Sequence, residues 1–78
     1  MQEVHNLIAE QFGLGVVHHD DDLVDDLRGD MLDIIELVMR LEEHYNIQID
    51  DYEADTIKTV QDVCDCVASK VNAATVAI

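Results

Sequence analysis

The chain contains no proline and only three glycines, so very little in it interrupts a helix. Glycine and proline are the strongest breaks in regular structure, and a β-sandwich of many short strands needs turns that contain them. A single phenylalanine and two tyrosines also leave the chain poor in aromatic residues. Because 78 residues allow one small core and no second one, we expect a single all-α domain over residues 1–78.

Charge narrows the classes of function. Eighteen Asp and Glu residues against four Lys and Arg give a formal net charge of −14. This charge repels nucleic acid and anionic membrane surfaces, and it favours basic protein partners or cations. Hydrophobic residues make up 49% of the chain, which is enough for a folded core.

The N-terminal segment has the spacing of an amphipathic helix. Its apolar residues are Val4, Leu7, Ile8 and Phe12. Gly13 and Gly15 follow them and are expected to end this helix. The connection over residues 14–30 is longer than a usual helix–helix linker. It is therefore either ordered by its apolar residues, Leu23, Val24 and Leu27, or functional in itself.

Residues 30–46 carry the strongest local signal. Asp30 is a good N-cap residue, and Asp33 lies at the acidic position of a capping box. Asn46 is expected to end the helix. The pattern predicts a wide apolar face made of Leu32, Ile34, Ile35, Leu37, Val38, Met39, Leu41 and Tyr45.

A short helix is expected after this segment. Ile47 and Ile49 lie in the connector and are expected to pack inward. Asp50 and Asp51 then open a brief helical turn that runs towards Ile57.

A last helix is expected to begin at Thr59, with Asp62 as a second capping-box candidate. Its predicted buried face consists of Val60, Val63, Cys64, Val67 and Val71. The tail 73–78 has no cap or pattern and is expected to fray. The sequence thus predicts a small bundle of three longer helices and one short helix, with a long first loop.

No catalytic residues are expected. Ser69 is the only serine, and no histidine lies near it in the sequence to act as its base. Cys64 and Cys66 are two residues apart, so on a helix they point about 200° from each other and do not readily bridge or chelate together. Unbridged thiols, the absence of a long apolar run and an N-terminus unlike a signal peptide favour a cytoplasmic location.

One patch offers weak candidates for metal ligands, namely His18, His19, Asp20 and Asp22. Carboxylates attract Ca²⁺ or Mg²⁺, and imidazoles attract Zn²⁺ or Ni²⁺. An EF-hand loop with Gly29 at its sixth position fails, because Val24 would then be the first ligand. We favour a solvated acidic loop over a specific cation site.

Residues 30–39 read D-M-L-D-I-I-E-L-V-M, and residues 23–27 before them read L-V-D-D-L. With the later segments L-E-E, I-D-D-Y-E-A and I-K-T-V-Q-D, nearly the whole chain resembles an acyl carrier protein. The resemblance implies an acyl-carrier-like helical bundle and a monomeric, non-enzymatic protein. Members of this family carry acyl groups on 4′-phosphopantetheine to enzymes of fatty-acid or related biosynthesis.

The chain departs from the family at position 31. The family hallmark is D-S-L-[DE], in which the serine hydroxyl carries 4′-phosphopantetheine, whereas this chain has Met31. A thioether cannot form the phosphodiester, and neither Asp30 nor Leu32 supplies a hydroxyl. The chain as written therefore holds no cofactor, and phosphopantetheine is expected only if position 31 were serine.

Two explanations of Met31 stay open. The natural protein has serine there and Met31 was introduced to keep it unmodified, or Met31 is native to an acidic regulator or decoy that binds carrier-recognising enzymes. The family pattern around position 31 favours an engineered, unmodifiable form. A small divalent-cation-binding protein is a third and weaker alternative.

The resemblance also implies roles for other residues. The carboxylates expected to face partners are Asp30, Asp33, Glu36, Glu42, Glu43 and Asp51. The expected partners are enzymes with basic patches, such as a phosphopantetheinyl transferase and the enzymes of acyl-chain synthesis and transfer. The expected acyl pocket, which also serves as core, consists of Val24, Leu27, Leu37, Val38, Leu41, Ile49, Ala54 and Ile57. We expect neither nucleic acid nor membrane insertion.

Overall fold

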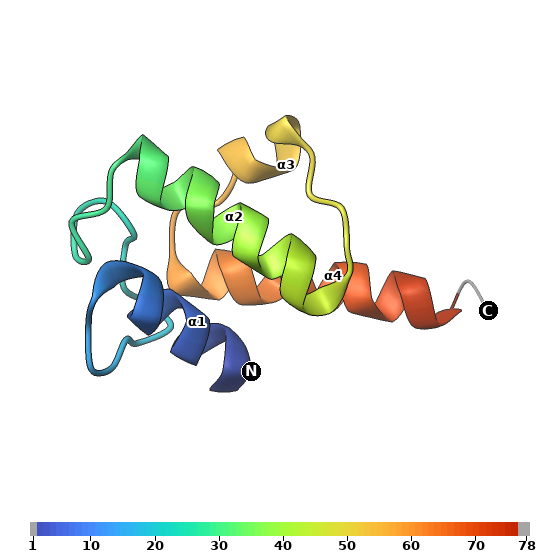
Figure 1. Ribbon diagram of the computed structural model, residues 1–78, viewed down its shortest axis with the longest axis horizontal. Coiled ribbons are helices and arrows are strands. Elements are labelled where there is room, and N and C mark those ends of the chain that lie inside the picture. Colours follow the sequence, from blue (N-terminus) through green and yellow to red (C-terminus); the bar gives the residue numbers. More distant parts are fainter. Residues whose placement is uncertain (1, 77–78) are drawn as a thin grey trace.

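The computed structural model describes the backbone of residues 2–76 and the side chains of residues 2–72. Within these residues there are four helices, α1 (Gln2–Phe12), α2 (Met31–Tyr45), α3 (Asp51–Asp55) and α4 (Val60–Val76) (Figure 1). The predicted bundle of three longer helices and one short helix is confirmed. The tail 73–78 is expected from the sequence to fray. Residues 73–76 of it belong to α4, and residues 77–78 lie outside the described residues. None of the helices in the described part is long and apolar enough to cross a membrane.

The helices begin and end where short-range signals place them. Asp30 and Asp33 form a complete capping box at the start of α2, and Asn46 ends the helix in the left-handed conformation with φ 54°. At the start of α4, the backbone N–H of Asp62 donates to the Thr59 hydroxyl at 3.1 Å, and the N–H of Thr59 donates to the Asp62 carboxylate at 3.1 Å. Both predicted capping boxes are confirmed.

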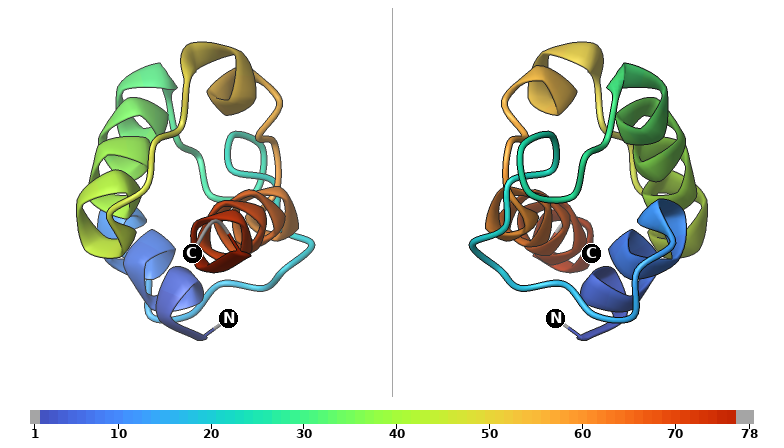
Figure 2. Two further views of the ribbon diagram at one scale, coloured as in Figure 1. Left: turned by 90° about the vertical axis from the view of Figure 1, so that its right-hand side faces the viewer. Right: turned by 90° about the vertical axis from the view of Figure 1, so that its left-hand side faces the viewer.

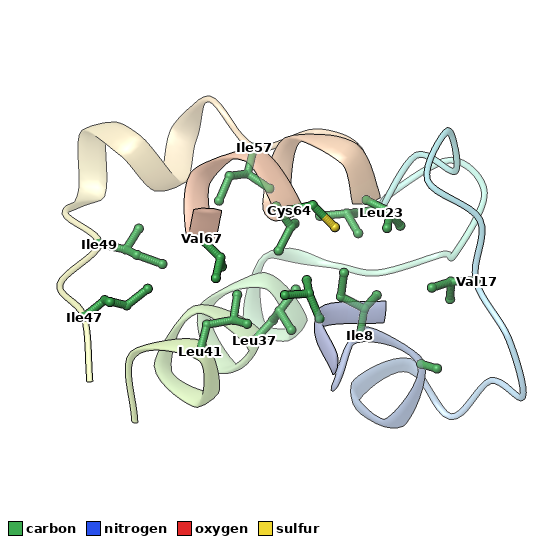
Figure 3. Packing of buried hydrophobic residues seen from close by; sticks show 14 residues of the cluster. Ile8, Val17, Leu23, Leu37, Leu41, Ile47, Ile49, Ile57, Cys64 and Val67 are labelled. Carbon is green, nitrogen blue, oxygen red and sulfur yellow. The ribbon is translucent and has the colours of Figure 1, made fainter. Parts of the chain in front are cut away.

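The core lies between α1, α2 and α4. In Figure 3, Ile8 of α1 and Leu37 and Leu41 of α2 extend towards Cys64 and Val67 of α4. The buried hydrophobic residues are Val4, Ile8, Ala9, Val17, Leu23, Leu37, Leu41, Ile47, Ile49, Ile57, Val60, Val63, Cys64 and Val67. Burial of these side chains is the main stabilising contribution to the bundle.

The short helix α3 lies at the side of the bundle away from α1 (Figures 1 and 2). It buries no residue of its own. Instead, Ile49 before the helix and Ile57 after it are buried in the core. An ion pair between Lys70 Nζ of α4 and Glu53 Oε1, 2.6 Å apart, adds a contact between the two helices. The position of α3 therefore depends on its flanking residues.

The long first loop is ordered by burial, one of the two alternatives that the sequence allowed. Leu23 is fully buried and Val17 is 4% exposed. The N–H of Leu23 donates to the Lys58 carbonyl at 2.9 Å, and the N–H of Gly29 donates to the Leu23 carbonyl at 2.8 Å. Val24 does not join the core, because its side chain is 53% exposed.

The buried face of α2 is narrower than the sequence pattern predicts. Leu37 and Leu41 are its only buried residues. Leu32, Ile35 and Met39 were expected to belong to the core-facing side, and that expectation is wrong because they are 67%, 48% and 58% exposed. Helix α2 packs against α1 and α4 with the side that carries Leu37 and Leu41, so the apolar residues on its other side face solvent.

Candidate functional site

Met31 is the first residue of α2, and its side chain is 76% exposed. It lies at the edge of a hollow of about 370 Å³ between the start of α2, the first loop and α3. The hollow is lined by Val24, Met31, Ile34, Ile35, Asp51, Ala54, Asp55 and Ile57. The capping box just before Met31 fixes the start of the helix, so this residue has a defined place beside an apolar hollow.

Three of the residues predicted for an acyl pocket, Val24, Ala54 and Ile57, line this hollow. The others do not. Leu37, Leu41 and Ile49 are buried in the core, and Leu27 and Val38 are half-buried against it.

Sequence reasoning missed five of the lining residues, Met31, Ile34, Ile35, Asp51 and Asp55, as pocket residues. The helical spacing of 31, 34 and 35 places them near one another on α2 and could have indicated them. The position of α3 across the hollow from α2 depends on residues far apart in the sequence, and no local pattern reveals it.

Three of the carboxylates predicted to face partners have structural hydrogen bonds. Asp30 and Asp33 cap α2. Glu42 accepts the backbone N–H of Ile49 at 2.9 Å, so it holds the connector that leads to α3. Asp30 and Asp33 thus stabilise the helix start at position 31, whereas Glu42 stabilises the connector at the other end of α2.

The other three predicted partner-facing carboxylates, Glu36, Glu43 and Asp51, are exposed. Glu36 also accepts a hydrogen bond from the Gln11 side chain at 2.9 Å, while Asp51 and the unforeseen Asp55 stand at the hollow. Exposed carboxylates therefore lie on both α2 and α3.

The candidate metal ligands are not assembled into a site. The Asp22 carboxylate accepts the backbone N–H groups of Val24 and Asp25, each at 2.9 Å, and so stabilises a turn. These bonds, that of Asp25 first, lower the pKa of Asp22. Within the described residues, no three His, Cys, Asp or Glu side chains are grouped to hold a metal ion.

Nucleophilic side chains lie away from Met31. Cys64 is in the core, and burial raises the pKa of this thiol and of Cys66, which keeps both in the unreactive thiol form at neutral pH. Ser69 shares a polar hollow with Cys66 on the α3–α4 side, and no histidine lines that hollow. The hollow at position 31 is lined by no hydroxyl residue. It can accommodate an apolar group but offers no hydroxyl oxygen to carry one.

Comparisons with known proteins identify relatives of the chain. A family model described as a phosphopantetheine attachment site matches residues 2–67. The acyl carrier protein of Syntrophobacter fumaroxidans is 40% identical over 68 residues, which cover 85% of this chain and 84% of that protein. The acyl carrier protein of Bdellovibrio bacteriovorus is 41% identical over 70 residues, which cover 87% and 90%.

Two solved structures share the fold. A Mycobacterium tuberculosis chain described as an acyl carrier protein has a TM-score of 0.84 at 32% identity, covering 87% of this chain and 93% of that one. The acyl carrier protein of Thermotoga maritima has a TM-score of 0.78 at 29% identity, covering 91% and 85%.

Proposed function

The chain belongs to the phosphopantetheine-attachment family of acyl carrier proteins, whose members are carriers and not enzymes, and we propose that it is a carrier-type module with Met31 at the attachment position. One observation carries the proposal. The capping box of Asp30 and Asp33 holds an exposed residue beside an apolar hollow at the start of α2, and that residue is methionine.

With serine at position 31, the same scaffold would carry 4′-phosphopantetheine, whose thiol binds acyl groups as thioesters for enzymes of fatty-acid or related biosynthesis. The hollow of about 370 Å³ falls within the range of small-ligand pockets, about 300–1,000 Å³. Its apolar lining, which includes Val24, Ala54 and Ile57, would cover part of an alkyl chain.

With methionine at position 31, the chain accepts no phosphodiester at this site. Our first candidate is a form kept unmodified by methionine in place of serine, because the caps and acidic surface around position 31 remain those of a carrier. The second candidate is a native acidic regulator or decoy that occupies carrier-recognising enzymes. Met31 is 76% exposed, so its side chain is available for contact with such an enzyme, as the second candidate requires.

We propose enzymes with basic patches as partners, including a phosphopantetheinyl transferase. Glu36, Glu43 and Asp51 are exposed, and complementary charge raises the rate of encounter and orients the partner. The net charge of −14 opposes self-association and supports a monomer, which we place in the cytoplasm.

The test is an intact-mass measurement after incubation with coenzyme A and a phosphopantetheinyl transferase. The variant Met31→Ser should gain one phosphopantetheine group, whereas the chain with Met31 should gain none. Met31→Ala is the matched control, because it also shortens the side chain but supplies no hydroxyl. If Met31→Ser is folded by circular dichroism and stays unmodified, the carrier assignment is wrong.

A further inference from the structure

Helix α3 forms one wall of the hollow beside Met31, although it has little packing of its own. Three of its residues, Asp51, Ala54 and Asp55, line the hollow. No residue of α3 is buried, and the extensive contacts between helices are those among α1, α2 and α4. Something other than the burial of its own side chains must therefore hold this wall in place.

The region between α3 and α4 is acidic on both helices. Glu53 of α3 lines a polar hollow of about 420 Å³ together with Asp62 and Asp65 of α4. Carboxylates that line one hollow repel one another, and the net charge of −14 adds to this repulsion. Without a cation between them, the two helices would be driven apart.

Lys70 of α4 supplies that cation. Its Nζ donates a hydrogen bond to Glu53 Oε1 at 2.6 Å, and the two side chains are only 30% and 32% exposed. This partial burial shields the ion pair from screening by salt. All four Lys and Arg residues lie in the part of the chain that the structure describes, and Lys70 is the only one of them with an ion pair.

Glu53 transmits this contact to the other side of α3. It is the third residue of the helix and forms the capping box with Asp50, so the ion pair ties the start of α3 to α4. Glu53 lines the polar hollow next to α4, whereas the three wall residues line the hollow beside Met31. Because α3 is a single short helix, a bond that fixes Glu53 against α4 also fixes the wall.

We propose that Lys70 is a positioning residue that holds α3 against α4 and thereby sets how firmly the hollow beside Met31 holds an apolar group. Lys70 does not line this hollow, so it acts through Glu53. The inference deepens the proposed function and rests on it, because the hollow is where an alkyl chain would be covered. It adds a residue of α4 to those that govern the hollow.

Amide hydrogen exchange followed by mass spectrometry tests the hold on α3. Lys70→Met removes the charge, and Lys70→Glu replaces it with another carboxylate. The amides of residues 51–56 should exchange about fivefold faster in Lys70→Met and faster still in Lys70→Glu, whereas Lys70→Arg should match the unchanged chain. Arg40→Met is the matched control, because it removes one positive charge from an exposed residue of α2.

Salt gives a second test of the same contact. At 1 M salt the screening length falls to about 3 Å, so the difference in exchange rate between Lys70→Met and Lys70→Glu should shrink. A difference that salt leaves unchanged would contradict the argument from repulsion between α3 and α4.

Binding of Nile red, an uncharged dye whose fluorescence rises in apolar surroundings, tests the hollow itself. Its Kd should rise about fivefold in Lys70→Glu, because α3 no longer offers a fixed wall, and should stay unchanged in Arg40→Met. Val24→Gln should raise the Kd as well, since Val24 lines the hollow. Its side chain is 53% exposed, so the core is left intact.

Equal exchange of the α3 amides in the unchanged chain and in Lys70→Glu would overturn the inference. Acceleration of the α1 and α4 amides by the same factor would overturn it too, because Lys70 would then stabilise the whole fold and not position α3. An unchanged Kd for Nile red in Val24→Gln, or in a Lys70 variant whose α3 exchanges faster, is equally incompatible with it.

The two proposals fail separately, because neither exchange nor dye binding requires phosphopantetheine. If Met31→Ser accepts phosphopantetheine while the Lys70 variants match the unchanged chain, the carrier assignment holds and this inference is wrong. If the Lys70 variants behave as expected while Met31→Ser stays unmodified, the carrier assignment is wrong and the role of Lys70 remains.

Discussion

Asp30 and Asp33 hydrogen-bond to each other's backbone at the start of α2: each carboxylate accepts the other's N–H at 3.0 Å. The pair satisfies two N–H groups that would otherwise lack a partner at the helix end. It also places two negative charges at the positive end of the helix dipole. Since Met31 is the residue directly after the cap, this pair determines where its side chain leaves the helix.

Removal of the cap should destabilise the fold. Asp30→Ala should lower the free energy of unfolding by about 1 kcal/mol, measured by urea denaturation, because the N–H of Asp33 loses its acceptor. Asp30→Asn should cost much less, since asparagine caps helices about as well. Asp25→Ala removes an exposed loop carboxylate and controls for the loss of charge. Equal effects of Asp30→Ala and Asp25→Ala would contradict the role of the cap.

Gly29 is expected to tolerate no side chain. A Cβ atom there would meet the Phe12 ring and lie 2.9 Å from the Leu23 carbonyl oxygen. Gly29→Ala should therefore cost about 1–3 kcal/mol in urea denaturation, the usual penalty for overpacking. Gly15→Ala is the control, because a Cβ at Gly15 would meet no atom within 4 Å. A loss of stability for Gly15→Ala as large as that for Gly29→Ala would refute this packing argument.

Asp22 should contribute stability that depends on pH. The N–H groups of Asp25 and Val24 lower its pKa in the folded chain below the ordinary 3.8. The contribution is therefore complete above the unfolded pKa and is lost as the pH falls through the lower folded pKa.

Urea denaturation of the chain and of Asp22→Ala at several pH values measures this contribution. The difference in unfolding free energy should stay constant above about pH 5 and shrink below about pH 4. Relief of the general charge repulsion at low pH acts on both proteins and cancels in the difference. A difference that does not change with pH would contradict this role of Asp22.

Substitutions at Met31 and at Leu37 should have very different effects on the free energy of unfolding. Met31 is 76% exposed, so Met31→Ser should change the unfolding free energy by no more than about 0.5 kcal/mol. Leu37 is 1% exposed, so Leu37→Ala should cost about 2–5 kcal/mol through the cavity it leaves. Thermal or urea unfolding measures both. A large loss for Met31→Ser would mean that this side chain helps to hold the fold.

The sequence alone predicts the helix ends well, because a cap is a local relationship. Asp30 with Asp33 and Thr59 with Asp62 are each three residues apart, and both pairs form the expected bonds. The burial of Ile49 and Ile57 is also as expected.

The surroundings of position 31 are less predictable from the sequence, because they depend on which side of α2 packs against the other helices. The periodicity of α2 allows an apolar face wide enough to include Leu32 and Met39, but packing on α1 and α4 buries only the Leu37 side. In the same way, Asp55 reaches the hollow because α3 lies beside α2, a contact between segments far apart in the sequence.

The central claim is that carrier-recognising enzymes bind this chain although it lacks the attachment hydroxyl. The most direct measurement is the rate at which a phosphopantetheinyl transferase loads Met31→Ser in the presence of increasing amounts of the unmodified chain with Met31. We predict competitive inhibition with a Ki close to the KM for Met31→Ser, and no mass change in the inhibitor. An unimpaired loading rate in a large excess of the Met31 chain would contradict the claim.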